Sequence, residues 1–326
     1  MFKAAKHEFE TAEEALEFYY DQGWTDGMPV VPPTVEKVQP FLEVVGLKPE
    51  TVLGTVPTRE VTVTAEQMAI NAVMAGCKPE YMPVVLAAVR ALMEEKANFH
   101  STTGTLSGAA QVLIINGPIR KELGVACKDG CFGPGFRPNA TIGRALRLLI
   151  RNVGRSIPGV LDRATYSTPA RYSFCFGENE EDSPWEPLHV ERGFAPTSSA
   201  VTLHASFYQA PSRDSVSREP KGILDSYART IRQYGVSGDA WIGENANLVV
   251  VIGMEHMRYF AEAKWTKQQM REYLFPKVKA PPEKGEFRVS LGKPEGILFV
   301  AAGGHGMNDS WMLFPHLAWA ITKPVG

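Results

Sequence analysis

The sequence contains few cysteines, only four in 326 residues: Cys77, Cys127, Cys131 and Cys175. So small a number argues against a disulfide-dense scaffold, which a chain of this length does not need. We therefore expect reduced thiols. Cys175 lies in an apolar run that predicts a buried position, whereas Cys77 precedes Lys78-Pro79 at a predicted helix break, where a thiol can be exposed.

The sequence also lacks an excess of either charge and lacks a long apolar run. Lys and Arg total 34 against 36 Asp and Glu, a formal net charge of −2, so no basic field favours nucleic acid. No run of about 18 apolar residues occurs, and residues 1–14 hold no apolar core of a signal peptide. These absences predict a cytoplasmic protein with neither a membrane nor a nucleic-acid partner.

What the sequence does contain is typical of a folded globular protein. Hydrophobic residues make up 44% and charged residues 21%, and we find no internal repeat and no low-complexity segment. The chain is longer than a usual single core. We predict a mostly helical N-terminal region, residues 1–100, packed on an α/β domain, residues 101–326, that carries the site.

Helix signals dominate the first hundred residues. Thr11-x-x-Glu14 and Thr64-x-x-Gln67 are capping-box signatures, and Pro79 marks a break before a further helix. The helices expected from these signals and from apolar periodicity cover residues 11–22, 34–45, 64–75 and 80–95.

Apolar runs after residue 110 predict strands with helices between them. The runs at 111–116, 248–252 and 297–301 are continuous, which indicates a sheet covered on both faces. Further strands are expected at 172–176 and 200–207, and helices at 140–153, 223–234, 257–263 and 266–275. The predicted fold class is α/β, with a mostly parallel or mixed sheet flanked by helices and a helical N-terminal part.

Glycine or polar residues follow each of four predicted strands. They are Asn116-Gly117, Gly177-Glu178, Gly253-Met254-Glu255-His256 and Gly303-Gly304-His305. Ligands of open α/β sheets bind outside the carboxyl ends of strands, and glycine lets the backbone approach a ligand closely. We predict a small-molecule site there, with Asn116, Glu255 and Gly304 as binding residues. The alternative is that the glycines only turn the chain and the histidines pack in the core.

The same strand ends supply residue types that suit acid and base chemistry. We predict Glu178, His256 and His305 as catalytic residues. Alternatively, Glu178, His189 and either His256 or His305 would hold a divalent metal, although no compact His-Glu-x-x-His motif is present.

Two loops carry further candidate binding residues. Asn139 is predicted to cap the helix at 140–153 beside Arg137, an arrangement that suits an anionic group. Gly133-x-Gly135 lacks a third glycine and follows no strand, so the dinucleotide fingerprint is absent and no such cofactor is expected. Asp26 lies in a proline-locked aromatic and acidic tract that is typical of a functional loop, although a plain surface connection is equally consistent.

Two other patterns favour a structural interpretation. Arg144, Arg147 and Arg151 recur at helical spacing, which is typical of a solvated helix face. Cys127-x-x-x-Cys131 is one residue wider than a thioredoxin-type pair, and no second pair completes a zinc site. An inert pair is therefore favoured over a redox role, which would need a lowered thiol pKa.

Several long segments carry a resemblance to a known group. They are Gly23-Trp-Thr-Asp-Gly-Met-Pro-Val-Val-Pro-Pro33, residues 71–85, residues 133–144, residues 178–191 and Gly253-Met-Glu-His256. In these segments the sequence resembles the family of uncharacterised proteins that carry, or are encoded beside, a selenocysteine-Gly-Ser-Cys motif.

The resemblance implies thiol or selenol redox chemistry, or attack on a carbon–heteroatom bond. This sequence has no Cys-Gly-Ser-Cys motif, which implies either a subunit that needs a small Sec- or Cys-containing partner or a chain that works without the motif. By match to the segments, Cys77 is the cysteine implied as a catalytic thiol.

The leading hypothesis is an enzyme that acts on a small polar or anionic molecule by acid/base and thiol chemistry, of oxidoreductase or lyase type. One alternative is a metal-dependent hydrolase or lyase that uses Glu and His ligands. The other is a non-catalytic substrate-binding subunit of a redox complex. We expect a homo-oligomer in each case.

Overall fold

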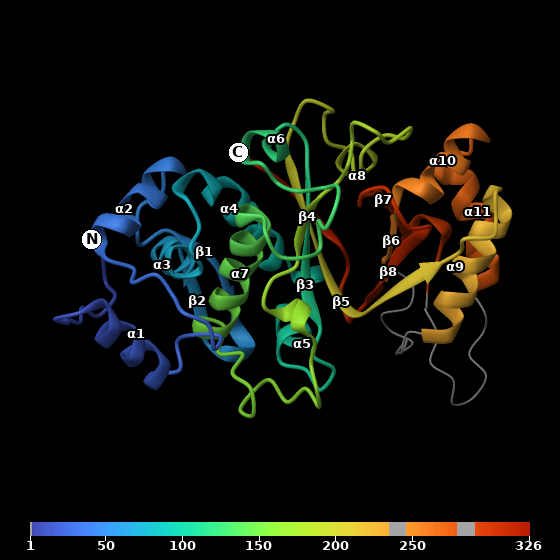
Figure 1. The fold of residues 1–326 in the computed structure, drawn as a ribbon. Coiled ribbons are helices and arrows are strands. Elements are labelled where there is room, and N and C mark those ends of the chain that lie inside the picture. The colour runs from blue at the N-terminus through green and yellow to red at the C-terminus, as the bar shows by residue number, and fades with distance from the viewer. Residues whose placement is uncertain (1, 235–245, 279–290) are drawn as a thin grey trace.

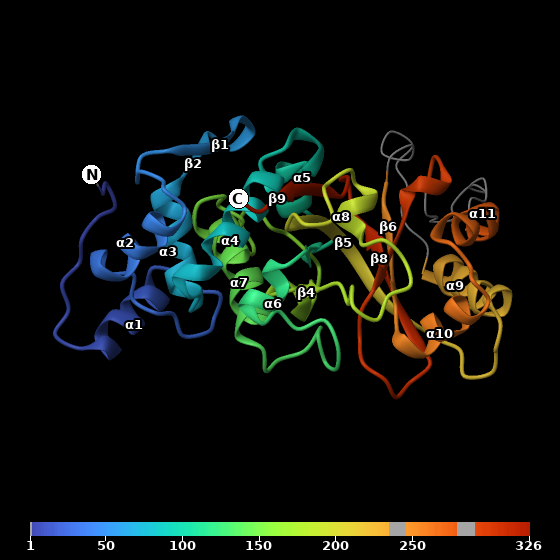
Figure 2. The ribbon, with the colours of Figure 1, turned by 90° about the horizontal axis from the view of Figure 1, so that it is seen from above.

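In the computed structural model, which describes residues 2–234, 246–278 and 291–326, a curled sheet lies between two groups of helices (Figure 1). Parallel and antiparallel strand pairs both occur in this sheet, and N-terminal helices lie on one side of it. The predicted α/β class is therefore confirmed. Seen from above, the N-terminal helices, the sheet and helices α9–α11 lie side by side (Figure 2).

The N-terminal part holds helices α1 Ala12–Asp21, α2 Val35–Val44, α3 Ala65–Ala75, α4 Met82–Leu92 and α5 Phe99–Thr103. Both predicted caps form, because the Thr11 hydroxyl accepts from the Glu14 amide and Thr64 exchanges hydrogen bonds with Gln67. Between α2 and α3 lies an antiparallel hairpin that the sequence analysis did not predict, β1 Val52–Val56 and β2 Val61–Thr64. No helix among the described residues combines the length and the apolar character needed to cross a membrane.

The main sheet runs in the order β4-β3-β5-β8-β6-β7, and β9 pairs with β5 beside this path. Its strands are β3 Ala110–Asn116, β4 Cys175–Gly177, β5 Ala200–Arg213, β6 Leu248–Ile252, β7 Ile297–Ala301, β8 Asp309–Pro315 and β9 Ile321–Pro324. The helices that accompany it are α6 Ile119–Leu123, α7 Arg137–Asn152, α8 Leu188–Glu191, α9 Pro220–Tyr234, α10 Met254–Glu262 and α11 Lys267–Val278.

Alternate residues of each central strand enter different apolar clusters. On β3, Val112 and Ile114 point into the interior of the curled sheet, whereas Leu113 packs with the N-terminal helices and α7. On β6, Val251 points into the same interior and Val250 packs against α9–α11. Because both faces are covered, both strands read as continuous apolar runs in the sequence.

Strand β5 bends and thereby brings distant strand ends together. Its first half pairs with β3 and its second half with β8, with an irregular register between Ser206 and Gln209. A bulge of this kind bends a strand. As a result, the end of β4 meets the end of β7, where the Asn179 amide donates to the Ala301 carbonyl at 2.7 Å.

The strand order also contains a repeat that the sequence analysis did not find. In the first unit, β3 pairs with β4 in parallel and with β5 in antiparallel orientation. In the second unit, β6 pairs with β7 in parallel and with β8 in antiparallel orientation, so β6, β7 and β8 correspond to β3, β4 and β5. Since β5 and β8 pair antiparallel, an approximate two-fold axis relates the two units.

Equivalent close contacts in both units support this relation. A Cβ on Gly117, after β3, would lie 2.2 Å from the Ser198 carbonyl oxygen, and one on Gly253, after β6, would lie 2.2 Å from that of Asp309. A serine follows each of the contacted residues, Ser198 and Asp309. Ser199 Oγ accepts from the Ile119 amide, and Ser310 Oγ accepts from the Gly253 amide. Glycine is needed at both points because the strand that returns passes so close.

Candidate functional site

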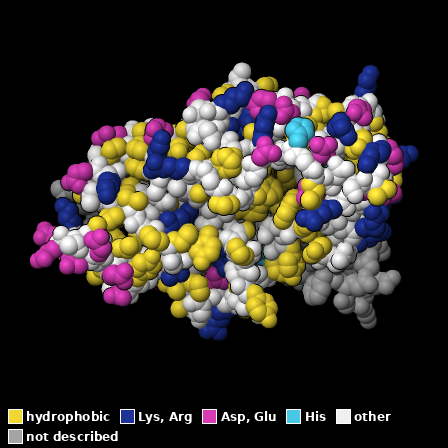
Figure 3. Space-filling view, in the orientation of Figure 1, with side chains coloured by type: hydrophobic (Ala, Val, Ile, Leu, Met, Phe, Trp, Pro, Cys, Tyr) yellow, Lys and Arg dark blue, Asp and Glu magenta, His cyan; other side chains and the backbone are white. Residues whose placement is uncertain are grey.

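The carboxyl ends of β3, β4, β6 and β7 meet at one end of the molecule, where the sequence analysis placed the site. Besides the Asn179–Ala301 hydrogen bond, the Gly303 amide donates to the Cys127 carbonyl at 2.9 Å. Asn179 Nδ2 also contacts Met254 Sδ, at the start of α10, at 3.2 Å. Figure 3 shows Lys, Arg, Asp and Glu side chains intermixed along the top of the molecule, with a histidine among them. We call this region the strand-end site.

Glu178 and Asn116 form the buried floor of the strand-end site. Asn116 Nδ2 donates to Glu178 Oε2 at 2.6 Å, and the Leu188 amide donates to the same oxygen at 2.8 Å. Glu178 Oε1 and Asn116 Oδ1 have no hydrogen-bond partner in the described part of the chain, although Lys267 Nζ lies 4.0 Å from Glu178 Oε1. Burial raises the pKa of Glu178, which favours a neutral carboxyl.

Above this floor, Arg120 joins two acidic side chains. Its guanidinium pairs with Glu180 at 3.0 Å and with Glu181 at 2.8 Å, and Glu180 Oε1 also accepts from the Gly117 amide at 2.7 Å. The hydrogen bond from Arg120 lowers the pKa of Glu181 to about 2. The Glu181 carboxylate is therefore ionised at neutral pH, and the contacts with Arg120 fix both acidic side chains in place.

Cys127 is the accessible thiol of the strand-end site. All four cysteines lie in the described residues, and the three others are buried. Cys127 lines a pocket of about 410 Å³ together with Arg120, Lys121, Lys128, Asp129, Phe136, Glu181 and residues 124–126. Its Sγ lies 3.8 Å from Arg120 Nη1, yet burial raises the pKa of the thiol, which stays protonated at neutral pH.

His305 and Glu255 meet at the rim. His305 Nδ1 lies 3.4 Å from Glu255 Oε1, and the imidazole is 78% exposed. The preceding Gly304 packs so tightly on Asp129 that a Cβ there would lie 1.7 Å from the Asp129 carboxylate. The loop that carries His305 therefore lies against the loop that carries Cys127 and Asp129.

His256 does not join these residues. It is fully buried, and its Nδ1 lies 2.9 Å from Ser310 Oγ and 3.2 Å from the Tyr227 hydroxyl, while Nε2 lies 3.1 Å from the Asp214 carbonyl oxygen. Burial lowers its pKa, which favours the neutral imidazole. The sequence analysis treated His256 as catalytic, but the structure places it in a network between α9, α10 and β8.

The predicted metal ligands are not assembled either. His189 is fully buried on α8, and neither of its ring nitrogens has a hydrogen-bond partner within the described ranges. No group of three or more His, Cys, Asp or Glu side chains in those ranges is arranged to hold a metal ion. Glu178, His189 and His256 therefore do not form a ligand set in this structure.

Cys77 and Arg137 lie beside the start of α7 rather than at the strand ends. The Cys77 thiol is buried and donates to the Thr141 carbonyl oxygen at 3.3 Å, and burial raises its pKa to about 12. Arg137 Nε donates to the Gly76 carbonyl oxygen at 3.1 Å. This environment makes Cys77 a structural thiol and moves the candidate role to Cys127, for which the sequence analysis favoured an inert pair.

Asn139 acts on the site indirectly. Helix α7 begins at Arg137, so Asn139 lies in its first turn and is not the cap that was predicted. Its amide exchanges hydrogen bonds with both backbone groups of Ala126 and donates to the Cys131 carbonyl oxygen at 3.2 Å. The side chain thereby fixes the loop that presents Cys127.

The arginine stripe on α7 is not a solvated face. Arg144 pairs with both carboxylate oxygens of Asp26 at 2.8 Å, and Arg151 Nε donates to the Gly23 carbonyl oxygen at 3.1 Å. The side chain of Arg144 is 13% exposed. The N-terminal loop therefore covers this helix face, and Asp26 is committed to Arg144 rather than to the strand-end site.

Fold and site together define an α/β protein built from two related units, with a polar site where four strand ends join. No protein-family model matches the sequence, and no curated protein shows a significant match to it.

Proposed function

We propose that this protein is an enzyme that acts on a small polar or anionic molecule at the strand-end site. The observation that carries the proposal is the position of Cys127, the one cysteine of the four that is not buried, in a pocket of about 410 Å³ lined by both cationic and acidic side chains. This volume falls within the range of small-molecule sites. Oxidoreductase or lyase chemistry is the type that the resemblance implies, and a thiol in a polar pocket can serve it as a nucleophile.

The neighbouring residues suit distinct roles. The carboxylate of Glu255 orients His305, which makes the exposed imidazole the candidate proton acceptor and donor. Because the Cys127 thiol is protonated at neutral pH, it needs such a base before it can act as a nucleophile. Gly304 packs against Asp129, two residues from Cys127, and so holds the His305 loop against the cysteine loop.

Glu178 and Asn116 support the site from below. Both are fully buried, so we assign them a positioning role and not direct contact with substrate. The neutral form of Glu178, favoured by burial, can donate a hydrogen bond from its unpartnered oxygen when a group or water enters.

The test begins with a ligand search. The full chain is screened by thermal shift against a panel of small polar and anionic metabolites, and each stabilising compound is then followed by NMR for conversion. Cys127→Ser and His305→Asn are compared with His7→Asn, which removes an exposed histidine in the N-terminal segment. We expect conversion by the wild type and by His7→Asn, and a loss of roughly two orders of magnitude or more in the other two variants.

Unchanged conversion in both Cys127→Ser and His305→Asn would refute the proposed roles. Stabilisation by a ligand without any conversion would instead favour the non-catalytic substrate-binding subunit. No geometric observation in the described residues favours a metal-dependent reaction over these two.

Four further features belong to the same proposal. Membership of the selenocysteine-Gly-Ser-Cys group, a small Sec- or Cys-containing partner subunit, a homo-oligomeric state and a cytoplasmic location all rest on the sequence. A partner thiol or selenol would act at Cys127, because Cys77 is buried. Co-purification of the chain with its genomic neighbours, followed by mass determination of the complex, tests the partner and the oligomer together.

A further inference from the structure

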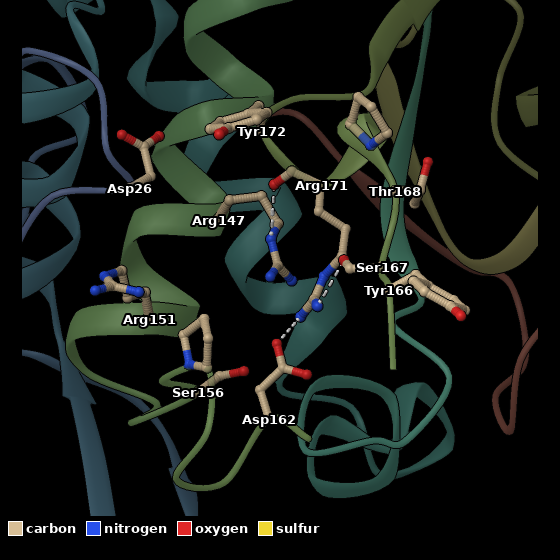
Figure 4. Close-up of a pocket in the computed structure, with 12 residues that line it drawn as sticks. Asp26, Arg147, Arg151, Ser156, Asp162, Tyr166, Ser167, Thr168, Arg171 and Tyr172 are labelled. Carbon is tan, nitrogen blue, oxygen red and sulfur yellow. Dashed lines mark hydrogen bonds and ion pairs between the residues drawn. The ribbon is translucent and has the colours of Figure 1, made fainter. Parts of the chain in front are cut away.

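A second pocket lies beside the last turns of α7, away from the strand-end site. The strand-end pocket reaches Phe136, just before α7 begins, whereas this pocket includes Arg147 and Arg151 near the end of the helix. Its volume is about 380 Å³. Figure 4 shows its lining side chains, which come from α7, the N-terminal loop and the connection between α7 and β4.

Two of the acidic groups near this pocket are already neutralised. Asp162 Oδ2 lies 2.5 Å from Arg171 Nη2, an ion pair between side chains that are 4% and 10% exposed. Asp26 is held by both nitrogens of the Arg144 fork. Each carboxylate is therefore already paired with an arginine, and only partly offsets the charge of Arg147.

Arg147 and Arg151 have no such partner. Neither forms an ion pair with a carboxylate in the part of the chain that the structure describes, and both line the pocket. Arg147 Nε donates to the Arg171 carbonyl oxygen at 3.1 Å, and its Nη1 donates to Gln111 Oε1. Figure 4 shows the guanidinium groups of Arg147 and Arg171 side by side, where their like charges repel.

Electrostatics also favour an anion beside Arg147. Burial, with a smaller contribution from Arg171, lowers the pKa of Arg147 to about 9, so the group is charged at neutral pH but poorly solvated. The Nε of Arg171, which is nine-tenths buried, also lacks a hydrogen-bond partner. A buried guanidinium without its hydrogen bonds is costly, and an anion in the pocket removes that cost.

We propose that this pocket binds a small dianion with carboxylate or phosphate oxygens through Arg147, Arg151 and Arg171. After the Arg171–Asp162 pair is set aside, two unmatched positive charges remain, which is why we specify a dianion. Arginine forks recognise carboxylate and phosphate oxygens in bidentate geometry. Ser156, Ser167 and Thr168 offer neutral hydroxyl groups around the same space, which holds a small molecule.

The test measures anion binding to the full chain by calorimetry at constant ionic strength. Malonate and inorganic phosphate are the dianionic probes, and acetate is the monoanionic control. Arg151→Gln removes one unmatched charge, and Arg163→Gln removes an exposed arginine on the neighbouring loop that does not line the pocket. Arg147→Lys keeps the charge but removes the fork, and the thermal midpoint of each variant shows whether it is folded.

We expect one malonate or phosphate per chain, bound more tightly than acetate. The dissociation constant should rise about tenfold or more in Arg151→Gln, and should stay within about twofold of wild type in Arg163→Gln. Equal weakening in both variants, or no preference for dianions, would overturn the proposal. Cys127→Ser should leave this binding unchanged, so the result is independent of the enzyme proposal.

Discussion

Acidification should unfold this protein at an unusually mild pH, because buried histidines are neutral in the folded state, and the pKa values of His204 and His316 are lowered to about 4. His204 on β5 is fully buried, and its Nε2 lies 3.2 Å from the Leu313 carbonyl oxygen. His316 lies after β8, with Nε2 3.0 Å from Thr105 Oγ1. Burial lowers the pKa of each imidazole from 6.5 to about 4.

The sign and the size of the effect follow from proton linkage. Both histidines have a lower pKa in the folded state than in the unfolded chain, so the unfolded chain binds protons first as the pH falls. The stability contributed by the neutral histidines is therefore present above pH 6.5 and is lost as the pH falls to about 4. Each histidine contributes a slope of about 1.4 kcal/mol per pH unit in that window. The two together remove roughly 5 kcal/mol over two pH units, comparable to the total stability of many domains.

Urea unfolding followed by far-UV circular dichroism at a series of pH values measures this slope. The variant His204→Gln retains an amide donor for the Leu313 carbonyl but cannot titrate, so its slope should be shallower by about 1.4 kcal/mol per pH unit, while His7→Gln should match the wild type. Glu181 and Asp214, both with pKa values lowered to about 2, lose their contributions only below about pH 4.5, so the slope is measured between about pH 6.5 and 4.5. A slope that His204→Gln leaves unchanged would refute the reasoning.

Two further predictions concern the strand-end site. Burial raises the pKa of Glu178, so the contribution of this carboxyl to stability is present at acid pH and is lost as the pH rises through the raised value. The variant Glu178→Gln should therefore gain stability relative to the wild type as the pH rises. A difference in urea unfolding that does not change with pH would contradict this. Gly304→Ala should lower the free energy of unfolding by about 1–3 kcal/mol, because the new Cβ would displace Asp129. The same displacement should change the rate at which a soluble disulfide labels Cys127. An unaltered melting temperature and labelling rate would contradict the close packing.

Elements that are marked by a cap or by a continuous apolar run within their own sequence were predicted. Helix α3 carries a complete capping box at Thr64 and Gln67, and the capped helix forms as expected. Strands β6 and β7 are continuous apolar runs because helices and the sheet interior cover both faces, and they form at the predicted residues.

Elements that depend on distant partners were missed. β8 begins with the polar residues Asp309 and Ser310, and its apolar run, residues 311–314, is only four residues long. Its central place in the sheet depends on β5 and β6, which pair with it on both sides. β5 extends to Arg213, beyond the predicted end at residue 207. The prediction stopped early because the irregular register near Ser206 breaks the alternation by which a strand is recognised in sequence.

The positions of the candidate site residues were predicted only in part, for the same reason. Asn116 and Glu178 were expected together because parallel neighbours end at one edge, and their side chains are in contact. His256 was placed there by sequence position alone, but α10 begins at Met254 and turns the imidazole toward Tyr227 and β8. Periodicity likewise could not show that a loop covers the arginine face of α7.

The two-unit architecture explains how these groups came to share a site. The first unit supplies the buried carboxyl of Glu178 and the thiol of Cys127, and the second supplies the imidazole of His305 with Glu255. Within the sheet, β3 and β6 run in opposite directions, since three antiparallel pairings separate them. Their carboxyl ends can meet only because β5 bends between Ser206 and Gln209. A change that straightens this bend should therefore separate the thiol from the imidazole while each unit keeps its own strands and helices.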